Sequence, residues 1–310
     1  MTFKVTILGT SSAIPTVSRY PTAHVVNLHE RFFLIDCGEG TQIRLKRYKF
    51  SFARIQHIFI SHLHGDHFYG LIGLISTRNL LAIGSDLHIY AHSELKNLLQ
   101  PMLDHLKHEL QFKILFHPLN FKRSEIIYSD LNAEVLSFPL QHSIPVCGFL
   151  FRERPGLPKL IKSQIEKLNI PITERKAIKE GFGYTAPDGT FYPTQQLTTP
   201  GTKPRAFAFC TDTLPQPQAM EFISGVNLLY HEATFQSDLA EWAAKTYHST
   251  ARQAAEMALL AKAEQLLIGH FSNRYKSVSN FGREARFVFP NTLIAEEGQT
   301  YPVPPNRKKS

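Results

Sequence analysis

Three histidines and one aspartate stand close together at His62, His64, Asp66 and His67. Imidazole nitrogens and carboxylate oxygens are common ligands of zinc and related divalent ions. Because His62 and His64 alternate along a short turn and Asp66 and His67 follow at once, one loop can reach two neighbouring ions. The alternative is a polar turn after a core strand, but four such side chains in so short a stretch favour a metal site.

The elements around this cluster indicate how it is positioned. The apolar run 56–60 is typical of a buried strand that leads into the cluster, and residues 68–81 predict a helix after it. Three more candidate ligands also follow predicted strands: His142 after strand 133–139, Asp212 after strand 205–210, and His270 after strand 265–269. Their repetition at strand ends favours one shared site, in which the two oxygens of Asp212 could bridge two cations.

Alternation of strands and helices predicts an α/β protein, a single catalytic domain over 1–310 whose sheets are covered by helices. Further expected strands lie at 3–9, 25–28, 31–36, 87–91, 112–117, 125–128 and 226–230. Expected helices lie at 41–54, 93–108 and 251–262, the last with Ser249 or Thr250 as its N-cap. The final residues 307–310 are expected to form a frayed basic end.

The composition changes between residues 152 and 204, which contain seven prolines. Two helical patterns are present, at 159–169 and 172–180. From residue 155 to 193, six lysines and arginines stand against four acids. A long insertion in a compact domain is usually functional or mobile, so this segment is predicted to be an arm that binds a substrate, a surface excursion or a dimerisation arm.

Overall composition excludes several classes of protein. A chain of 310 residues with 43% hydrophobic residues is ordinary for a globular enzyme, and no apolar run reaches the roughly 20 residues of a membrane helix. The N-terminus enters a strand pattern instead of a signal peptide, so we expect a cytoplasmic protein without membrane attachment. Cys37, Cys147 and Cys210 are widely spaced and predict buried free thiols instead of disulfides or a zinc knuckle.

Positive charge points weakly to a polyanionic partner. The formal net charge is +8, which attracts polyanions at long range. The segment 41–54 contributes five cations interleaved with aromatic residues. It predicts either a phosphate-binding face or a solvated helix with an apolar inner face.

The pattern His-x-His-x-Asp-His after a core strand resembles the metallo-β-lactamase superfamily. Four other stretches make the chain similar to the ribonuclease Z family: the loop 9–15, the turn 36–40, His231–Thr234, and His248–Thr250. The resemblance covers nearly the whole chain. It implies an αβ/βα four-layer sandwich with an inserted flexible arm at 152–204.

The resemblance also implies a function, the removal of the 3′ trailer from precursor tRNA by a homodimeric endoribonuclease with two Zn²⁺ per subunit, other divalent metals being possible. One ion would be held by His62, His64 and His142, the other by Asp66, His67 and His270, with Asp212 bridging. Asp66 would orient or deprotonate the attacking water, while Glu232 and His248 would protonate the leaving group. The arm would clamp the tRNA, and the candidate substrate-binding cations are Arg19, Arg274, Lys159 and Lys162.

One loop departs from the family pattern. The family carries Pro-x-Lys-x-Arg-Asn where this chain has Val17 and Tyr20 in place of the lysine and asparagine. A phosphate-type cation is lost, and the Tyr20 ring could stack on an unpaired base. We therefore predict altered discrimination among precursor 3′ sequences.

Two other classes of function remain open at this level. A different hydrolase of the superfamily, such as a small-molecule phosphodiesterase or a thioesterase resembling glyoxalase II, would share the ligands but would not need the arm. A non-catalytic RNA-binding or structural zinc protein would need neither Asp66 nor the pair Glu232 and His248.

Overall fold

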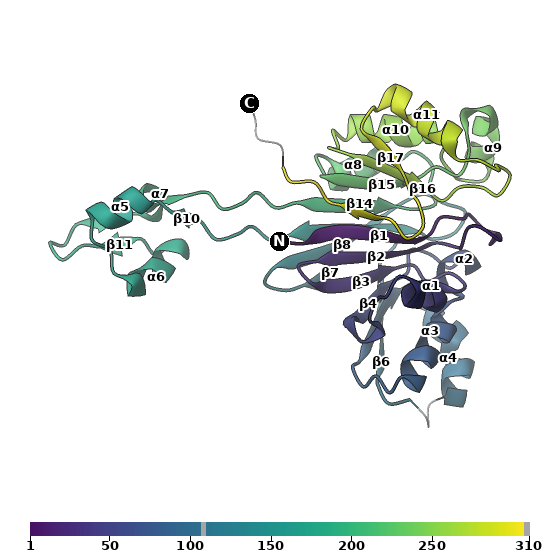
Figure 1. Ribbon diagram of the computed structural model, residues 1–310, viewed down its shortest axis with the longest axis horizontal. Helices are drawn as coiled ribbons and strands as arrows, with labels where there is room; N and C mark the ends of the chain where they lie inside the picture. The colour runs from purple at the N-terminus through teal and green to yellow at the C-terminus, as the bar shows by residue number, and fades with distance from the viewer. Residues whose placement is uncertain (107–109, 307–310) are drawn as a thin grey trace. The chain divides into compact units, whose positions relative to one another are not determined.

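The computed structural model describes residues 1–106 and 110–306 (Figure 1). It divides into a larger unit, Met1–Arg152 with Ala206–Pro305, and a smaller unit, Glu153–Arg205 with Asn306, which we call the arm. The predicted basic end 307–310 and the last two residues of the helix predicted at 93–108 lie outside the described residues. Within the described ranges, every helix is too short or too polar to cross a membrane.

The larger unit contains two seven-stranded sheets. The first has the spatial order β18 (Thr300–Pro302), β1 (Phe3–Gly9), β2 (Ala23–Leu28), β3 (Arg31–Ile35), β4 (Ile55–Phe59), β5 (Leu87–Ala91) and β6 (Ile114–Pro118). The second has the order β17 (Thr292–Ile294), β16 (Leu266–Gly269), β15 (Leu228–Glu232), β14 (Ala206–Cys210), β9 (Cys147–Glu153), β8 (Ala133–Pro139) and β7 (Glu125–Ser129). Strands β3 to β6 are parallel, as are β14 to β17.

Apolar strands pack the two sheets face to face. Phe59 of the first sheet lies 5.5 Å from Phe149 of the second between ring centroids, and Phe33 lies 5.6 Å from Phe151. All four rings are fully buried, and each contributes roughly 1.5–3 kcal/mol through loss of water contact. This shared core fixes the relative position of the loops at the sheet ends.

Helices cover the outer face of each sheet (Figure 1). The first sheet carries α1 (Thr41–Arg47), α2 (Gly65–Phe68), α3 (Leu71–Leu80) and α4 (Glu94–Leu106), with the 3-10 helix η1 (Phe52–Arg54) between α1 and β4. The second carries α8 (Met220–Ile223), α9 (Ala240–Lys245), α10 (Ala251–Leu260) and α11 (Ser279–Val288), with 3-10 helices η3 (Pro217–Ala219) and η4 (Ser237–Leu239). The predicted αβ/βα four-layer sandwich is confirmed.

The helix predicted at 41–54 is wrong in its second half. Helix α1 ends at Arg47, and Lys49 takes a left-handed conformation with φ 60°. This allows the Phe50 amide to bond to the Leu45 carbonyl and end the helix. Arg44 is buried and donates to the Leu8 carbonyl and to Glu297, so the cations of this segment do not share one exposed face.

Two other predicted elements shift. The helix expected at 68–81 is observed as α3, and the separate short helix α2 precedes it, with Gly70 between the two. A side chain at Gly70 would collide with the Gly38 carbonyl, so a glycine is needed where the two turns approach. The strand expected at 226–230 runs instead as β15 to Glu232, which places His231 and Glu232 inside the sheet.

The arm has its own small core. It contains β10 (Lys159–Leu160), α5 (Lys162–Lys167), η2 (Ile172–Glu174), α6 (Arg175–Lys179), β11 (Tyr184–Thr185), β12 (Phe191–Tyr192), α7 (Thr194–Leu197) and β13 (Thr198–Thr199). Strand β10 pairs with β13, and β11 pairs with β12. Its buried apolar residues are Ile165, Ile170, Ile178, Tyr184 and Leu197.

Candidate metal centre and active site

The predicted ligands lie at one edge of the two sheets, where parallel strands end. Strand β4 leads into the loop that carries the histidine cluster, β14 leads to Asp212, and β16 leads to His270. His142 comes from the connection between β8 and β9. In α/β sheets, the carboxyl ends of parallel strands are the usual place for a site.

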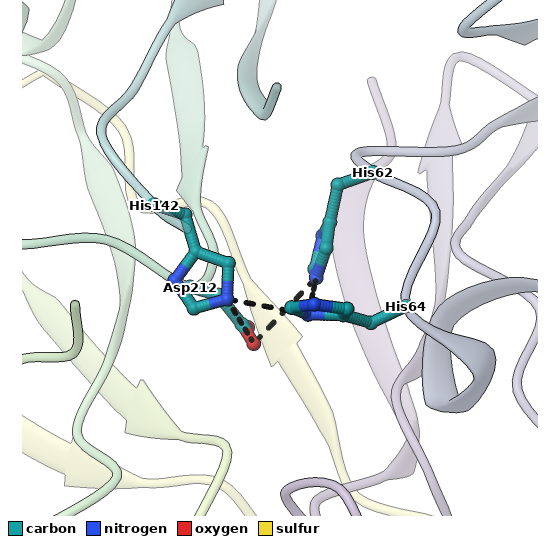
Figure 2. A group of neighbouring side chains, drawn as sticks. All are labelled: His62, His64, His142 and Asp212. Carbon is teal, nitrogen blue, oxygen red and sulfur yellow. Dashed lines mark hydrogen bonds and ion pairs between the residues drawn. The ribbon is translucent and has the colours of Figure 1, made fainter. Parts of the chain in front are cut away.

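A first group consists of His62, His64, His142 and Asp212, whose ligand atoms all lie within 4.8 Å of one another (Figure 2). His64 Nδ1 is 3.1 Å from His62 Nε2 and 3.2 Å from His142 Nε2. Asp212 Oδ2 is 3.7 Å from His62 Nε2 and 4.0 Å from His142 Nε2. Three imidazoles and one carboxylate oxygen therefore point to a common centre.

A second group consists of Asp66, His67 and His270. Asp66 Oδ2 is 3.4 Å from His67 Nε2 and 3.6 Å from His270 Nε2, and it accepts a hydrogen bond of 2.8 Å from the Ala13 amide. Asp212 faces this group with its other oxygen, Oδ1, which is 3.2 Å from His270 Nε2 and 3.5 Å from His67 Nε2. Each oxygen of Asp212 thus faces a different group.

Hydrogen bonds orient four of the five imidazoles. The Nδ1 atom of each donates outward, which leaves the lone pair of Nε2 pointing into the site. The acceptors are Ser61 Oγ for His62 at 3.0 Å, Asp36 Oδ2 for His67 at 2.7 Å, the Tyr247 carbonyl for His142 at 2.8 Å, and Thr234 Oγ1 for His270 at 2.9 Å.

These residues fit two divalent cations. The buried Nε2 atoms of His67 and His270 form no hydrogen bond with any residue that the structure describes. Unpaired buried nitrogens are costly unless something occupies their lone pairs. In the first group, the converging lone pairs of His62 and His142 would also repel without a cation between them. A donor set of imidazoles and carboxylates suits zinc and similar divalent metals.

Beside the second group lies a charged pair, Glu232 and His248. His248 Nδ1 donates to Glu232 Oε1 at 3.0 Å. Glu232 is fully buried and also accepts from the amides of Thr213, Ser249 and Thr234, which offsets the cost of burying its charge. Thr250 caps α10 with a capping box, as one of the two predicted N-cap residues, and so fixes the chain directly after His248.

The interaction between Glu232 and His248 shifts the pKa of each residue in the direction that favours its charged form. Burial lowers the pKa of His248, but the Glu232 carboxylate outweighs it and raises the pKa to about 9. Burial raises the pKa of Glu232, but His248 outweighs it and the pKa lies below its usual range. Glu232 therefore favours the imidazolium form of His248. Its ring also lies within 4.8 Å of ligand atoms of Asp212 and His270, so it faces the same space.

A cavity of about 480 Å³ opens over these groups. The metal-type side chains that line it are His64, Asp66, His142 and Asp212. Its other lining residues are Ser12, Ala13, Glu39, Gly65, Tyr69, Ser143, Thr246 and His248. A larger cavity of about 550 Å³ between α4 and β6 contains none of the predicted ligands.

The predicted substrate-binding cations do not all lie free. Arg19 donates through Nη2 to the carbonyls of Ser272 and Tyr275, which ties the first loop to the segment after His270. Arg274 is exposed, with its guanidinium carbon 5.7 Å from the centre of the Trp242 ring. Lys159 and Lys162 are exposed on the arm. None of the four lines the cavity over the ligands.

The roles of two residues of the site were not predicted from the sequence. Asp36 was noted only as part of a turn, yet its carboxylate accepts from His67 and from Ser61 Oγ at 2.9 Å. Thr234 donates to Glu232 at 2.7 Å and accepts from His270, so it joins the charged pair to a ligand. A polar residue beside each candidate ligand was a weak signal, because most such residues only close turns.

One family model and several named relatives match this chain. A family model described as Anti-Pycsar protein Apyc1 matches residues 3–158. Ribonuclease Z of Bacteroides fragilis (strain YCH46) is 46% identical over 296 residues, which cover 95% of this chain and 97% of that protein. Ribonuclease Z of Phocaeicola vulgatus is 47% identical over 295 residues, covering 95% and 96%.

Solved structures agree with the fold. The short form of human tRNase Z is 25% identical, with a TM-score of 0.71 and coverage of 97% of this chain and 99% of that chain. The metallo-β-lactamase fold protein YhfI from Bacillus subtilis is 18% identical with a TM-score of 0.68, which shows the fold alone. The chain is an endoribonuclease that belongs to the ribonuclease Z family and has the metallo-β-lactamase fold.

Proposed function

We propose that this protein is a zinc-dependent endoribonuclease that removes the 3′ trailer from precursor tRNA and leaves a 3′ hydroxyl on the tRNA. One observation carries the proposal, the placement of the Glu232 and His248 pair, joined at 3.0 Å, beside two groups of metal-type ligands in a chain of the ribonuclease Z family. The human neighbour's name, tRNase Z, gives the substrate class.

Two divalent ions would be held by the residues that fit them. The first would bind His62, His64 and His142, the second would bind Asp66, His67 and His270, and Asp212 would bridge. When bound, such ions supply a water of lowered pKa as nucleophile and neutralise negative charge on the phosphate. Asp66 is held by the Ala13 amide, so its carboxylate is placed to orient the attacking water.

His248 supplies the proton that the leaving group needs. Attack of water on phosphorus breaks the bond to the 3′ oxygen of the last tRNA nucleotide, which would leave as a strongly basic alkoxide. The imidazolium of His248 transfers a proton to this oxygen and gives the 3′ hydroxyl, while the trailer keeps the phosphate at its 5′ end. Glu232 orients the ring and favours its charged form.

The remaining parts serve substrate capture. The arm binds tRNA, with Lys159 and Lys162 as phosphate contacts and Arg274 of the larger unit as a further cation. Arg19 contributes by holding the first loop in place. We also propose a homodimer that acts in the cytoplasm on its RNA substrate.

Cleavage assays with the purified protein test the proposal. We expect precursor tRNA to be cut to a tRNA with a 3′ hydroxyl, with activity lost on chelation and restored by Zn²⁺. Bis(4-nitrophenyl) phosphate and a glutathione thioester serve as comparison substrates. Efficient turnover of either with no cleavage of precursor tRNA would show a different hydrolase of the same fold.

A further inference from the structure

Glu297 is a largely buried acid that belongs to neither group of ligands. It lies in the connection between β17 and β18, and 10% of its side chain is exposed. Gly298, the next residue, has φ 87° and donates through its amide to the Ile7 carbonyl at 2.8 Å, so this connection is fixed against β1. A carboxylate removed from water is costly without partners, so the partners of Glu297 indicate its role.

One oxygen of Glu297 holds both ends of the first loop, which we define as residues 10–20. Its Oε1 accepts from the Tyr20 amide at 2.7 Å and from the Thr10 amide at 3.2 Å. The Tyr20 carbonyl also accepts from the amides of Thr10 at 3.0 Å and Ser11 at 2.9 Å. The carboxylate therefore keeps the two ends of the loop together.

Arg44 holds the second oxygen of Glu297. Its Nη2 donates to Oε2, and its Nε donates to the Leu8 carbonyl at 3.0 Å. The guanidinium also lies over the rings of Tyr20 and Tyr48, with its carbon 4.4 and 4.7 Å from their centroids. Since 6% of the Arg44 side chain is exposed, this cation serves the carboxylate and not the surface.

The first loop reaches the second group of ligands at two points. The Ala13 amide donates to Asp66 Oδ2 at 2.8 Å. The Ser12 amide donates at 3.1 Å to the carbonyl of Phe271, which directly follows His270. Ala13 has φ 55°, a left-handed conformation that a residue with a side chain keeps only where the surrounding structure holds it. Closure of the loop at its base therefore supports the orientation of the Asp66 carboxylate.

We propose that Glu297 is a positioning residue for the second ion and for the attacking water. It closes the first loop, the loop fixes the Ala13 amide, and the amide orients Asp66. This assignment rests on the proposed function, because it assumes that Asp66 binds a cation and orients water. The hydrogen bonds of residues 10–20, all of which the structure describes, reach none of the four ligands of the first group, so the effect should be confined to one ion.

Zinc binding tests the assignment without RNA. Competition with a chelator gives the affinities of the two ions in the purified protein. Glu297→Ala should lower one affinity by about tenfold and leave the other within about twofold of the wild type. Because no RNA is present, failure of the wild type to cleave precursor tRNA would overturn the proposed function and leave this comparison valid.

Kinetics give a second readout that a purely structural role would not produce. In Glu297→Ala, kcat should fall by about tenfold both on precursor tRNA and on bis(4-nitrophenyl) phosphate, because both reactions use the same attacking water. The KM for precursor tRNA should stay within about twofold of the wild type, since the change does not touch the arm.

Two further variants separate the carboxylate from the ion pair. Loss of Glu297 leaves the buried Arg44 without its carboxylate, which could unfold the protein, so Glu297→Ala is also combined with Arg44→Met. The double variant should show the same loss of one zinc affinity. Arg44→Met alone keeps the carboxylate bonded to Thr10 and Tyr20 and should keep both affinities within about twofold of the wild type.

Asp130 provides the matched control for stability. Its Oδ1 accepts from the amides of Asn132 at 2.7 Å and Ala133 at 2.8 Å, and its Oδ2 pairs with Arg31, so it also closes a loop beside an arginine. The seven residues of β8 separate it from the connection that carries His142. Asp130→Ala should lower the Tm and leave both zinc affinities and kcat unchanged.

Three results would overturn the assignment. One is a Glu297→Ala variant, or the double variant, with both zinc affinities and kcat unchanged. Another is an equal loss of both zinc affinities, which would mean that Glu297 supports the fold as a whole. The third is a rise in KM for precursor tRNA without a fall in kcat, which would assign Glu297 to substrate binding.

Discussion

Charged side chains are buried at the ligand groups but exposed on the arm. At the site, Asp212 and Glu232 are buried, and Glu232 alone accepts five hydrogen bonds. On the arm, Lys159 and Lys162 are exposed, and the arm's core consists of a few apolar residues. Charges that must act on a reacting atom are fixed before substrate arrives, whereas charges that attract a long polyanion do not need fixed positions.

The difference predicts a ranking of substitutions. A buried charge with several partners cannot be removed without leaving those partners unpaired, so changes at the site should have large effects on activity. Exposed side chains lose little when changed singly. Mutations in the two regions can therefore confirm or contradict the division between chemistry and capture.

The largest effect is expected for Asp212→Ala. Its two oxygens face separate ligand groups, so the change should release both ions and reduce RNA cleavage by about a thousandfold or more. His64→Ala touches one group and should chiefly weaken one ion. Metal analysis of both purified variants checks this, and two ions retained in the Asp212 variant would contradict the bridging role.

His248→Ala should have the next largest effect. We expect RNA cleavage to fall by on the order of a hundredfold or more, with little change on bis(4-nitrophenyl) phosphate, whose leaving group needs no proton. Equal loss on both substrates, with metal content intact, would remove His248 from the acid role. Loss of an ion would identify it as a ligand.

The pH profile gives a second measurement of the same residue. His248 must be protonated to act, so wild-type RNA cleavage should fall as pH rises through the pKa of His248, which Glu232 raises to about 9 before any cation binds. Bound cations would lower that pKa and move the fall to a lower pH. The fall should be absent from the nitrophenyl substrate.

Most of the fold and all of the candidate ligands were predicted from the sequence, but different ligands were found by different signals. The loop His62–His67 concentrates four ligands and is visible without a structure. Asp212 and His270 each follow a different apolar strand. They were found because parallel sheets bring the residues after such strands to one edge. The roles of Asp36 and Thr234 could not be predicted, because each depends on contacts between residues distant in sequence.

Prediction from local sequence also failed where tertiary contacts determine the end of a helix or the direction of a side chain. The segment 41–54 has a helical composition, but the left-handed Lys49 ends α1 early, and Arg44 turns inward to Glu297. The Arg44 guanidinium also lies over one face of the Tyr20 ring, which the sequence offers for base stacking. Helix propensity predicted the first half of segment 41–54 correctly. It could not show that Arg44 would be buried and so unable to bind phosphate at the surface.

The partners that orient the ligands should give intermediate effects. Asp36→Asn replaces the charged acceptor of the His67 Nδ1 proton with a neutral amide, and Thr234→Val removes the acceptor of the His270 Nδ1 proton. We expect zinc affinity to fall by about 10- to 100-fold in each variant, measured by competition with a chelator. Thr234→Ser keeps the hydroxyl and should retain wild-type affinity. A normal affinity in Thr234→Val would show that the ligand is oriented by other contacts.

Replacing the arm with a short Gly/Ser linker should affect binding instead of chemistry. We expect the KM for precursor tRNA to rise by roughly tenfold or more, while turnover of bis(4-nitrophenyl) phosphate changes little. The measurement is the full rate profile on both substrates with metal content as the control. Equal losses on both would mean that the arm supports the fold or the site, and the contrast between the two regions would fail.

The smallest effect is expected for a single cation of the arm. Lys162 is 89% exposed in its side chain, and its Nζ lies 3.7 Å from Glu166 Oε1 on the same helix. An exposed pair of this kind adds little to folding, so Lys162→Ala should leave the Tm nearly unchanged. If Lys162 contacts a phosphate, its loss should weaken tRNA binding modestly and reduce the slope of log K against log salt concentration by about 1. Glu166→Ala is the matched control because it breaks the same ion pair but keeps the cation, and its salt slope should not decrease. Equal slopes in the wild type and the Lys162 variant would show that this lysine makes no phosphate contact, and the arm would then have to bind RNA through other side chains.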